Sequence, residues 1–164
     1  MNVQRIEPGP GQESVWDYPR PPAVSPSTSL IRVVHAGVTV AETRCAVRVL
    51  ETSQPPAFYI PRADITPGSL RQAAGRSLCE WKGMATYWDV VVGGVVVPDA
   101  AWSYEYPTAS FTAITGHVAF YARSLDECWV DDERVDPNPG SFYGGWITSR
   151  VVGPFKGGPG TIGW

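Results

Sequence analysis

The stretch Ser77-Leu-Cys-Glu-Trp-Lys-Gly-Met-Ala-Thr-Tyr-Trp88 places a thiol, a carboxylate, an ammonium and three aromatic rings within twelve positions. If it forms a strand, alternate side chains point to opposite faces. Cys79 and Tyr87 then share one face, whereas Lys82 and Trp88 share the other. Glu80 lies on the face of Lys82, about 7 Å along the strand, so their long side chains can pair. The stretch predicts a site but names neither a substrate nor a reaction.

The composition favours turns and short strands over long helices. Glycine and proline contribute 17 and 16 of the 164 residues, and both interrupt regular elements. Aromatic residues make up 12% of the chain, which argues against simple disorder. The length suits one domain with a substantial core. A net charge of −3 without runs of lysine and arginine predicts no nucleic-acid partner.

Several features predict a cytoplasmic protein that does not interact with membranes. No apolar run reaches the roughly 20 residues of a membrane span. The first thirty residues hold six prolines and no apolar core of the signal-peptide type. The three cysteines, Cys45, Cys79 and Cys128, cannot all pair within one chain. An odd number of cysteines fits reduced thiols.

Three segments are expected along the chain. Residues 1–27 form an extended N-terminal arm, residues 28–135 the core domain, and residues 136–164 a Gly- and Pro-rich C-terminal arm. The arms carry tryptophans, Trp16 and Trp146 among them, that are too apolar for free tails. We therefore expect both arms to pack on the core. The sequence does not decide whether the arms also join two copies of the chain into a homodimer.

Turn signals and alternation predict the elements of the core. Hairpins are expected around Ala36-Gly37 and Gly93-Gly94, because both pairs suit tight turns between apolar strands. Counting outward from Gly93-Gly94 puts Tyr104 opposite a residue near Gly83, a register that a bulge would shift. Residues 43–51 fit a strand or a helical turn. The other expected elements are strands at 57–60, 117–121 and 128–130, helical turns near 64–70 and 110–116, and a loop through Gly75.

Six short elements carry a family resemblance: Val49-Leu-Glu-Thr52, Tyr59-Ile-Pro61, Cys79-Glu-Trp-Lys-Gly83, Ala85-Thr-Tyr-Trp88, Ala101-Trp-Ser-Tyr104 and Val118-Ala-Phe-Tyr121. Together they resemble the bacterial domain-of-unknown-function family 427, over about residues 30–135. The resemblance implies a mostly-β fold, two antiparallel sheets in a β-tent-like arrangement with short helical turns and extended arms. It implies no activity. Many members have proline where this chain has Glu80, which argues against a catalytic role for Glu80.

The resemblance also bears on metal binding. Proteins with the β-tent architecture, such as methionine sulfoxide reductase B, usually hold zinc between two Cys-x-x-Cys pairs. This chain has no such pair. It also lacks a spaced carboxylate pair for a catalytic metal, and His35 and His117 have no spacing to a nucleophile. We expect neither a metal nor a cofactor.

Lys82 is the most informative candidate, because a lysine among apolar and aromatic neighbours needs compensation for its charge. It either reaches solvent, pairs with Glu51 or Glu80, or faces a ligand. In the last case it anchors a carboxylate or carbonyl oxygen, or acts as an acid or base, with Glu51 beside it. Cys79 is either a nucleophile, if a nearby cation favours its thiolate, or a small core residue.

Aromatic rings complete the expected site. An apolar pocket with a few polar groups is the usual form of a small-molecule site. The candidate rings are Trp81, Trp88, Trp102, Tyr104 and Trp146, of which some must belong to the core. We predict a protein that binds a small polar metabolite and acts on it. A binding module without catalysis and a structural or partner-binding protein are the alternatives.

Overall fold

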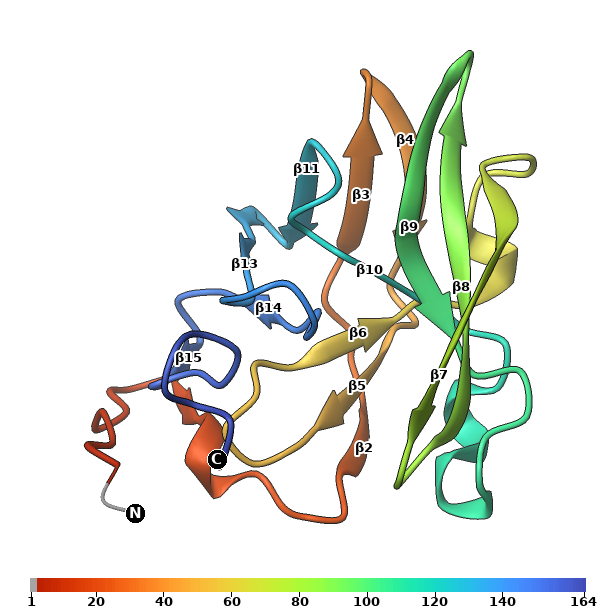
Figure 1. Ribbon diagram of the computed structural model, residues 1–164. Helices are drawn as coiled ribbons and strands as arrows, with labels where there is room; N and C mark the ends of the chain where they lie inside the picture. Colours follow the sequence, from red (N-terminus) through yellow and green to blue (C-terminus); the bar gives the residue numbers. More distant parts are fainter. Residues whose placement is uncertain (1–2) are drawn as a thin grey trace.

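The computed structural model describes residues 3–164, and its regular elements are strands and short 3-10 turns (Figure 1). None of the helices in this range is long and apolar enough to cross a membrane. The elements are β1 (Glu13–Ser14), η1 (Val15–Asp17), β2 (Ala23–Pro26), β3 (Ile31–His35), β4 (Val38–Thr43), β5 (Val47–Leu50), β6 (Ala57–Tyr59), η2 (Arg62–Asp64), β7 (Leu70–Cys79), β8 (Gly83–Val92), β9 (Val95–Ser103), η3 (Ala109–Ile114), β10 (Val118–Phe120), β11 (Glu127–Val130), β12 (Glu133–Arg134), β13 (Asp136–Pro137), β14 (Trp146–Ile147) and β15 (Val151–Val152).

The strands form several antiparallel sheets, which confirms the predicted mostly-β class. The larger sheets have the strand orders β10-β9-β8-β7, β12-β11-β3-β4 and β2-β5-β6. Ile60 and Val118 exchange two backbone hydrogen bonds, of 2.8 and 2.9 Å. These bonds link the end of β6 to β10, so that the β2-β5-β6 sheet continues into the β10-β9-β8-β7 sheet. The inner faces of these two sheets carry the site.

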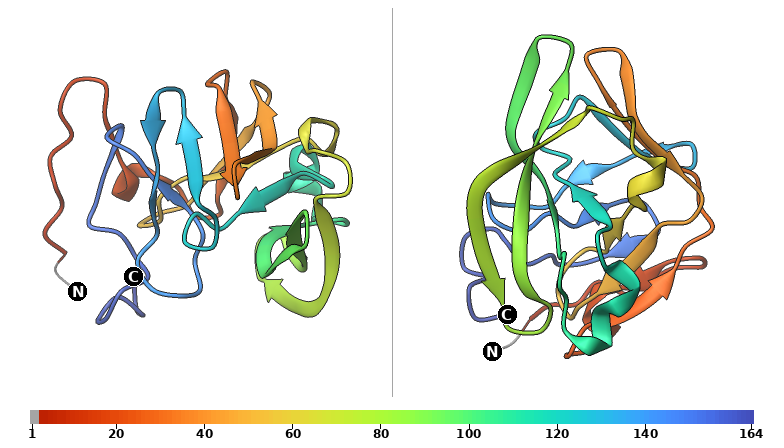
Figure 2. Two further views of the ribbon diagram at one scale, coloured as in Figure 1. Left: turned by 90° about the horizontal axis from the view of Figure 1, so that it is seen from above. Right: turned by 90° about the vertical axis from the view of Figure 1, so that its right-hand side faces the viewer.

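Both expected hairpins are present, and their tips project from the same end of the molecule (Figure 2). Ala36 and Gly37 turn with φ angles of 48° and 75°, and Gly93 with 58°. Such left-handed residues match the twist of the strands that a tight hairpin joins.

A bulge in β9 changes the register that counting from the turn predicts. Near the turn Val90 pairs with Val97, but beyond the bulge Trp88 pairs with Ala101. Asp99 lies in the bulge with a φ of 48°, and its N–H donates to a carboxylate oxygen of Asp89 over 3.0 Å. As a result Ser103 pairs with Thr86, two residues from the predicted register.

Two further expectations need correction. The central stretch is not one strand, since residues 80–82 form the turn between β7 and β8. The segment through Gly75, expected to be a loop, belongs to β7. Pairing with β8 holds it extended despite its weak strand propensity. The cost is an irregularity between Gln72 and Arg76, where β7 has more residues than β8.

The two terminal segments pair with each other and with the core. β1 lies parallel to β15, and the Trp16 indole N–H donates to the Pro154 carbonyl over 2.8 Å. The main-chain N–H of Trp146 donates to the Pro56 carbonyl over 2.8 Å. β2, from the end of the expected N-terminal arm, is a strand of the sheet with β5. The C-terminal segment thereby reaches the inner face of the sheets.

Candidate functional site

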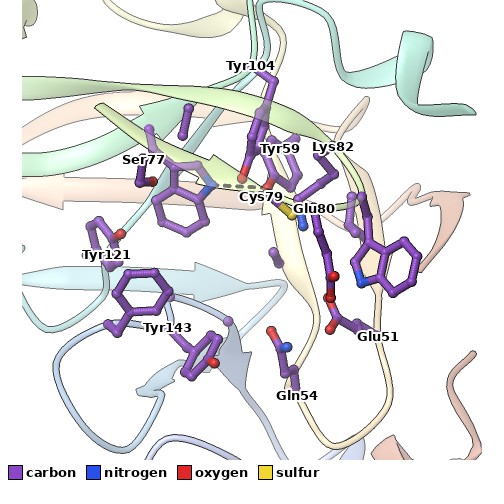
Figure 3. A pocket seen from close by; sticks show the side chains of 18 of the residues that line it. Glu51, Gln54, Tyr59, Ser77, Cys79, Glu80, Lys82, Tyr104, Tyr121 and Tyr143 are labelled. Carbon is purple, nitrogen blue, oxygen red and sulfur yellow. Dashed lines mark hydrogen bonds between the residues drawn. The ribbon is translucent and has the colours of Figure 1, made fainter. Parts of the chain in front are cut away.

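A cavity of about 380 Å³ opens between the β7–β9 strands and the β5–β6 strands, with the C-terminal segment as its third wall (Figure 3). This volume is at the small end of the range for ligand pockets. Its walls are formed by Val49, Glu51, Gln54, Pro55, Ala57, Tyr59, Ser77, Leu78, Cys79, Glu80, Trp81, Lys82, Ala85, Tyr87, Trp102, Tyr104, Tyr121, Phe142, Tyr143, Gly144, Gly145 and Lys156.

Strand alternation explains which side chains face the cavity. Successive strands each contribute residues two apart: Ser77 and Cys79, Ala85 and Tyr87, Trp102 and Tyr104, Ala57 and Tyr59. The turn at residues 80–82 breaks this alternation. Because of the turn, Lys82 reaches the cavity together with Cys79, whereas strict alternation puts the two on opposite faces.

An aromatic wall closes the back of the cavity. The Trp102 indole N–H donates to the Tyr59 hydroxyl over 3.0 Å. The Trp102 and Tyr121 rings have centroids 4.5 Å apart at a tilt of 41°. The C-terminal segment runs against this pair at Gly144, where a Cβ would be only 2.4 Å from the Trp102 ring. Glycine is therefore required for the close approach of this segment.

Two buried phenols have hydroxyl groups on this wall. Tyr59 is 1% exposed and Tyr104 is 6% exposed, and burial raises the pKa of both hydroxyls. Both stay protonated at neutral pH and can donate. Within residues 3–164 neither hydroxyl donates to an oxygen or nitrogen acceptor, and Cys79 is a polar neighbour of Tyr104. An oxygen acceptor of a ligand would satisfy these donors.

Lys82 lies beside this donor pair without an anionic partner. Its Nζ is 5.6 Å from the centroid of the Tyr104 ring, and its side chain is half-buried. In the described part of the chain no carboxylate lies within 4.0 Å of it. Glu51 instead approaches Arg20 over 3.4 Å, and Glu80 is exposed. The pairing of Lys82 with Glu51 or Glu80, one of the three alternatives left open by the sequence, is not formed in the described residues.

Cys79 differs from the other two cysteines. All three are free thiols. Cys45 is exposed outside the cavity, and Cys128 is buried, which raises its pKa to about 12. Cys79 is half-buried on the cavity wall. Its thiol is a neighbour of the Tyr104 hydroxyl, and the Lys82 ammonium lies 5.6 Å from the centroid of the same Tyr104 ring.

Trp88 and Trp146, two of the five candidate rings, do not line this cavity. Trp88 lies on the opposite face of β8, where its N–H donates to Ser103 over 2.9 Å and the Arg62 guanidinium covers its ring. Trp146 is 1% exposed and donates to the Phe120 carbonyl over 2.8 Å. The indole hydrogen bonds of Trp88 and Trp146 thus join parts of the fold to each other, as in structural residues. Trp81, Trp102 and Tyr104 line the cavity.

The sequence interpretation missed several residues of the cavity. Tyr59 and Tyr121 lie within the quoted family elements, so the alternation of those strands could have identified them. Tyr143 and Lys156 come from the Gly-rich C-terminal segment. This segment has no hydrophobic periodicity from which the direction of its side chains could be predicted. Their place depends on tertiary contacts.

The described residues include no group of three or more His, Cys, Asp or Glu side chains placed to hold a metal ion. His117 contacts the Thr115 carbonyl oxygen over 3.1 Å, and His35 accepts a hydrogen bond from the Asp126 N–H over 3.1 Å. Neither histidine lines the cavity. The polar groups that line the cavity include the Cys79 thiol, the Lys82 ammonium, carboxylates and phenols.

Comparison with known proteins gives a family. No curated protein matches the chain. The profile of the domain of unknown function DUF427 matches residues 23–131, more than half of the chain. The matched segment contains β2 to β11 and most of the cavity wall, and the third wall lies outside it. The chain thus belongs to the DUF427 family.

Proposed function

We propose that this protein binds a small polar metabolite in the cavity and acts on it, with Lys82 as the anchor and Cys79 as the nucleophile. One observation carries the proposal. An ammonium that has no ion pair within residues 3–164, two phenol donors and a half-buried thiol line one cavity. A buried or half-buried cation is costly unless something compensates it, and a bound ligand is the available source.

The arrangement suits a ligand with an acceptor oxygen next to an electrophilic carbon. The ammonium and the phenol hydroxyls bind the oxygen, and charge-assisted hydrogen bonds of this kind are the stronger ones. The thiolate of Cys79 attacks the adjacent carbon, its electron pair forms the S–C bond, and the carbonyl π pair moves onto the oxygen. Glu51, at the cavity wall, is the candidate acceptor for the thiol proton.

A binding module without catalysis is the second candidate. Aromatic side chains form much of the wall, and such walls bind planar ligands without chemistry. The two functions differ in the role of Cys79. An enzyme loses turnover but keeps ligand affinity when Cys79 is replaced, whereas a binding module loses affinity through changes of Trp102 or Tyr104 alone.

The direct test is the reactivity of Cys79 toward iodoacetamide, followed by mass spectrometry in a Cys45→Ala background. We expect Lys82→Met to slow the alkylation of Cys79 several-fold, because the proposal places the ammonium beside the attacking sulfur, and a neighbouring cation speeds attack by a cysteine. Arg44→Met is the matched control, since Arg44 is exposed outside the cavity. An equal rate in Lys82→Met and wild type would remove Cys79 and Lys82 as a catalytic pair.

A further inference from the structure

We infer that the ligand of this cavity is a flat, aromatic monocarboxylate. The inference rests on the binding part of the proposed function alone, because it names the class of molecule that the same site takes, and the carbon of a free carboxylate is not one that a thiolate attacks. Three properties of the cavity lead to it: the position of the cations, the aromatic walls and the place of the carboxylates.

The cations define an anion-binding site. The chain contains two lysines, Lys82 and Lys156, and both line this cavity. The Lys156 ammonium lies 5.2 Å from the Tyr143 ring centroid and donates to the Trp164 main-chain oxygen over 3.0 Å. Lys82 has no such oxygen acceptor within the described residues, and its ammonium lies 5.6 Å from the ring centroid of Tyr104, whose hydroxyl has Cys79 as a polar neighbour. A carboxylate has two oxygens to accept from this group, whereas a neutral amide or alcohol leaves the charge uncompensated.

Aromatic rings favour a flat body for the ligand. Tyr121 and Tyr143 lie on the same side of the cavity in Figure 3, and Trp102 continues this surface. Arg123 holds the C-terminal part of the wall, because its guanidinium lies 4.1 Å over the Tyr121 ring and donates to the Tyr143 carbonyl over 3.0 Å. Offset or edge-on contacts with such rings favour another aromatic ring over a saturated one.

The carboxylates limit the ligand to one acidic group. In Figure 3, Glu51 and Gln54 lie at the end of the cavity away from Tyr59 and Tyr104, and Glu80 points toward Glu51. A second carboxylate on the far side of the ligand would meet these like charges, which repel it. A hydrogen-bond donor or an apolar edge is compatible with this end.

Four small probes separate these properties in ligand-observed NMR titrations. Benzoate carries the ring and the charge, benzamide the ring without the charge, cyclohexanecarboxylate the charge without the flat ring, and terephthalate a second carboxylate. We expect benzoate to bind about tenfold or more tightly than benzamide, the usual effect of charge-assisted hydrogen bonds. Cyclohexanecarboxylate and terephthalate should each bind several-fold more weakly than benzoate.

Two variants assign these preferences to residues. Lys82→Met should reduce the preference for benzoate over benzamide to within about threefold, whereas Arg44→Met should keep it. Tyr143→Leu should weaken benzoate several-fold and keep the charge preference, a result that does not depend on the folding of Lys82→Met. Equal binding of benzoate and benzamide to wild type, or a preference that survives in folded Lys82→Met, overturns the inference.

The outcome is separable from the test of the proposed function. Benzoate selectivity that depends on Lys82, together with Cys79 alkylation that does not, supports the ligand class and rejects the catalytic pair. Alkylation that depends on Lys82 without any preference for benzoate supports the catalytic pair and rejects the ligand class.

Discussion

Replacement of Gly144 by alanine is expected to destabilise the protein, because this residue seats the C-terminal segment on the aromatic wall. The new Cβ would lie 2.4 and 2.6 Å from two carbons of the Trp102 ring and 2.8 Å from Cδ1 of Tyr121. Carbon atoms in ordinary contact are about 3.5–4.0 Å apart. One of the partners must therefore move by about 1 Å.

The rings have little freedom to move. Trp102 is 8% exposed, bonds Tyr59 through its indole N–H and packs against Tyr121. Overpacking of this kind costs about 1–3 kcal/mol. Gly144 has no left-handed φ, so alanine also loses less conformational entropy on folding, which offsets about 0.4–1 kcal/mol. The net loss, up to about 2.6 kcal/mol and centred on about 1 kcal/mol, lowers the melting temperature by roughly 2–4 °C at the centre and up to roughly 10 °C at the upper end.

Thermal melts of wild type, Gly144→Ala and Gly158→Ala measure this effect. Gly158 lies in the same C-terminal segment, and its Cβ would meet Pro139 at an ordinary 3.7 Å. Gly158→Ala should melt within about 2 °C of wild type. If Gly144→Ala melts as high as Gly158→Ala, the C-terminal segment does not lie against Trp102 and does not form the third wall of the cavity.

Three further outcomes are expected. Hydrogen bonds from the Asp99 N–H and from Arg71 hold the pKa of Asp89 below its usual 3.8, so its contribution to stability is complete above pH 3.8 and is lost as the pH falls through the lowered value. Asp89→Asn should melt roughly 2–4 °C below wild type at pH 7, and this difference in melting temperature should become progressively smaller in acid. A difference that does not depend on pH contradicts this. Limited proteolysis of native protein should leave residues 3–27 and 140–164 intact, because both segments form hydrogen bonds with the rest of the fold; rapid removal of either segment contradicts this, and removal of residues 140–164 with unchanged benzoate binding would show that this segment does not cover the cavity. Elemental analysis of protein purified without chelator or affinity metal should find substoichiometric zinc, since no Cys-x-x-Cys pair is present, and one zinc per chain would refute this.

The local features of the chain were predictable because they depend on neighbours in sequence. The hairpins at Ala36-Gly37 and Gly93-Gly94 follow from residues that tolerate a left-handed turn between apolar strands. The alternation that separates Tyr87 from Trp88 within β8 follows from the period of two in any strand. The mostly-β class and the family elements likewise needed no knowledge of distant contacts.

The cavity depends on contacts that sequence spacing does not determine. A bulge at Asp99, held by the Asp89 carboxylate, shifts the β8–β9 pairing by two residues, and thus sets which residues face each other across these strands. The turn at residues 80–82 brings Lys82 to the side of Cys79. Tyr143 reaches the same wall because Gly144 can lie against Trp102. These arrangements were decided by the tertiary structure, since each results from side chains far apart in sequence that compete for the same buried space.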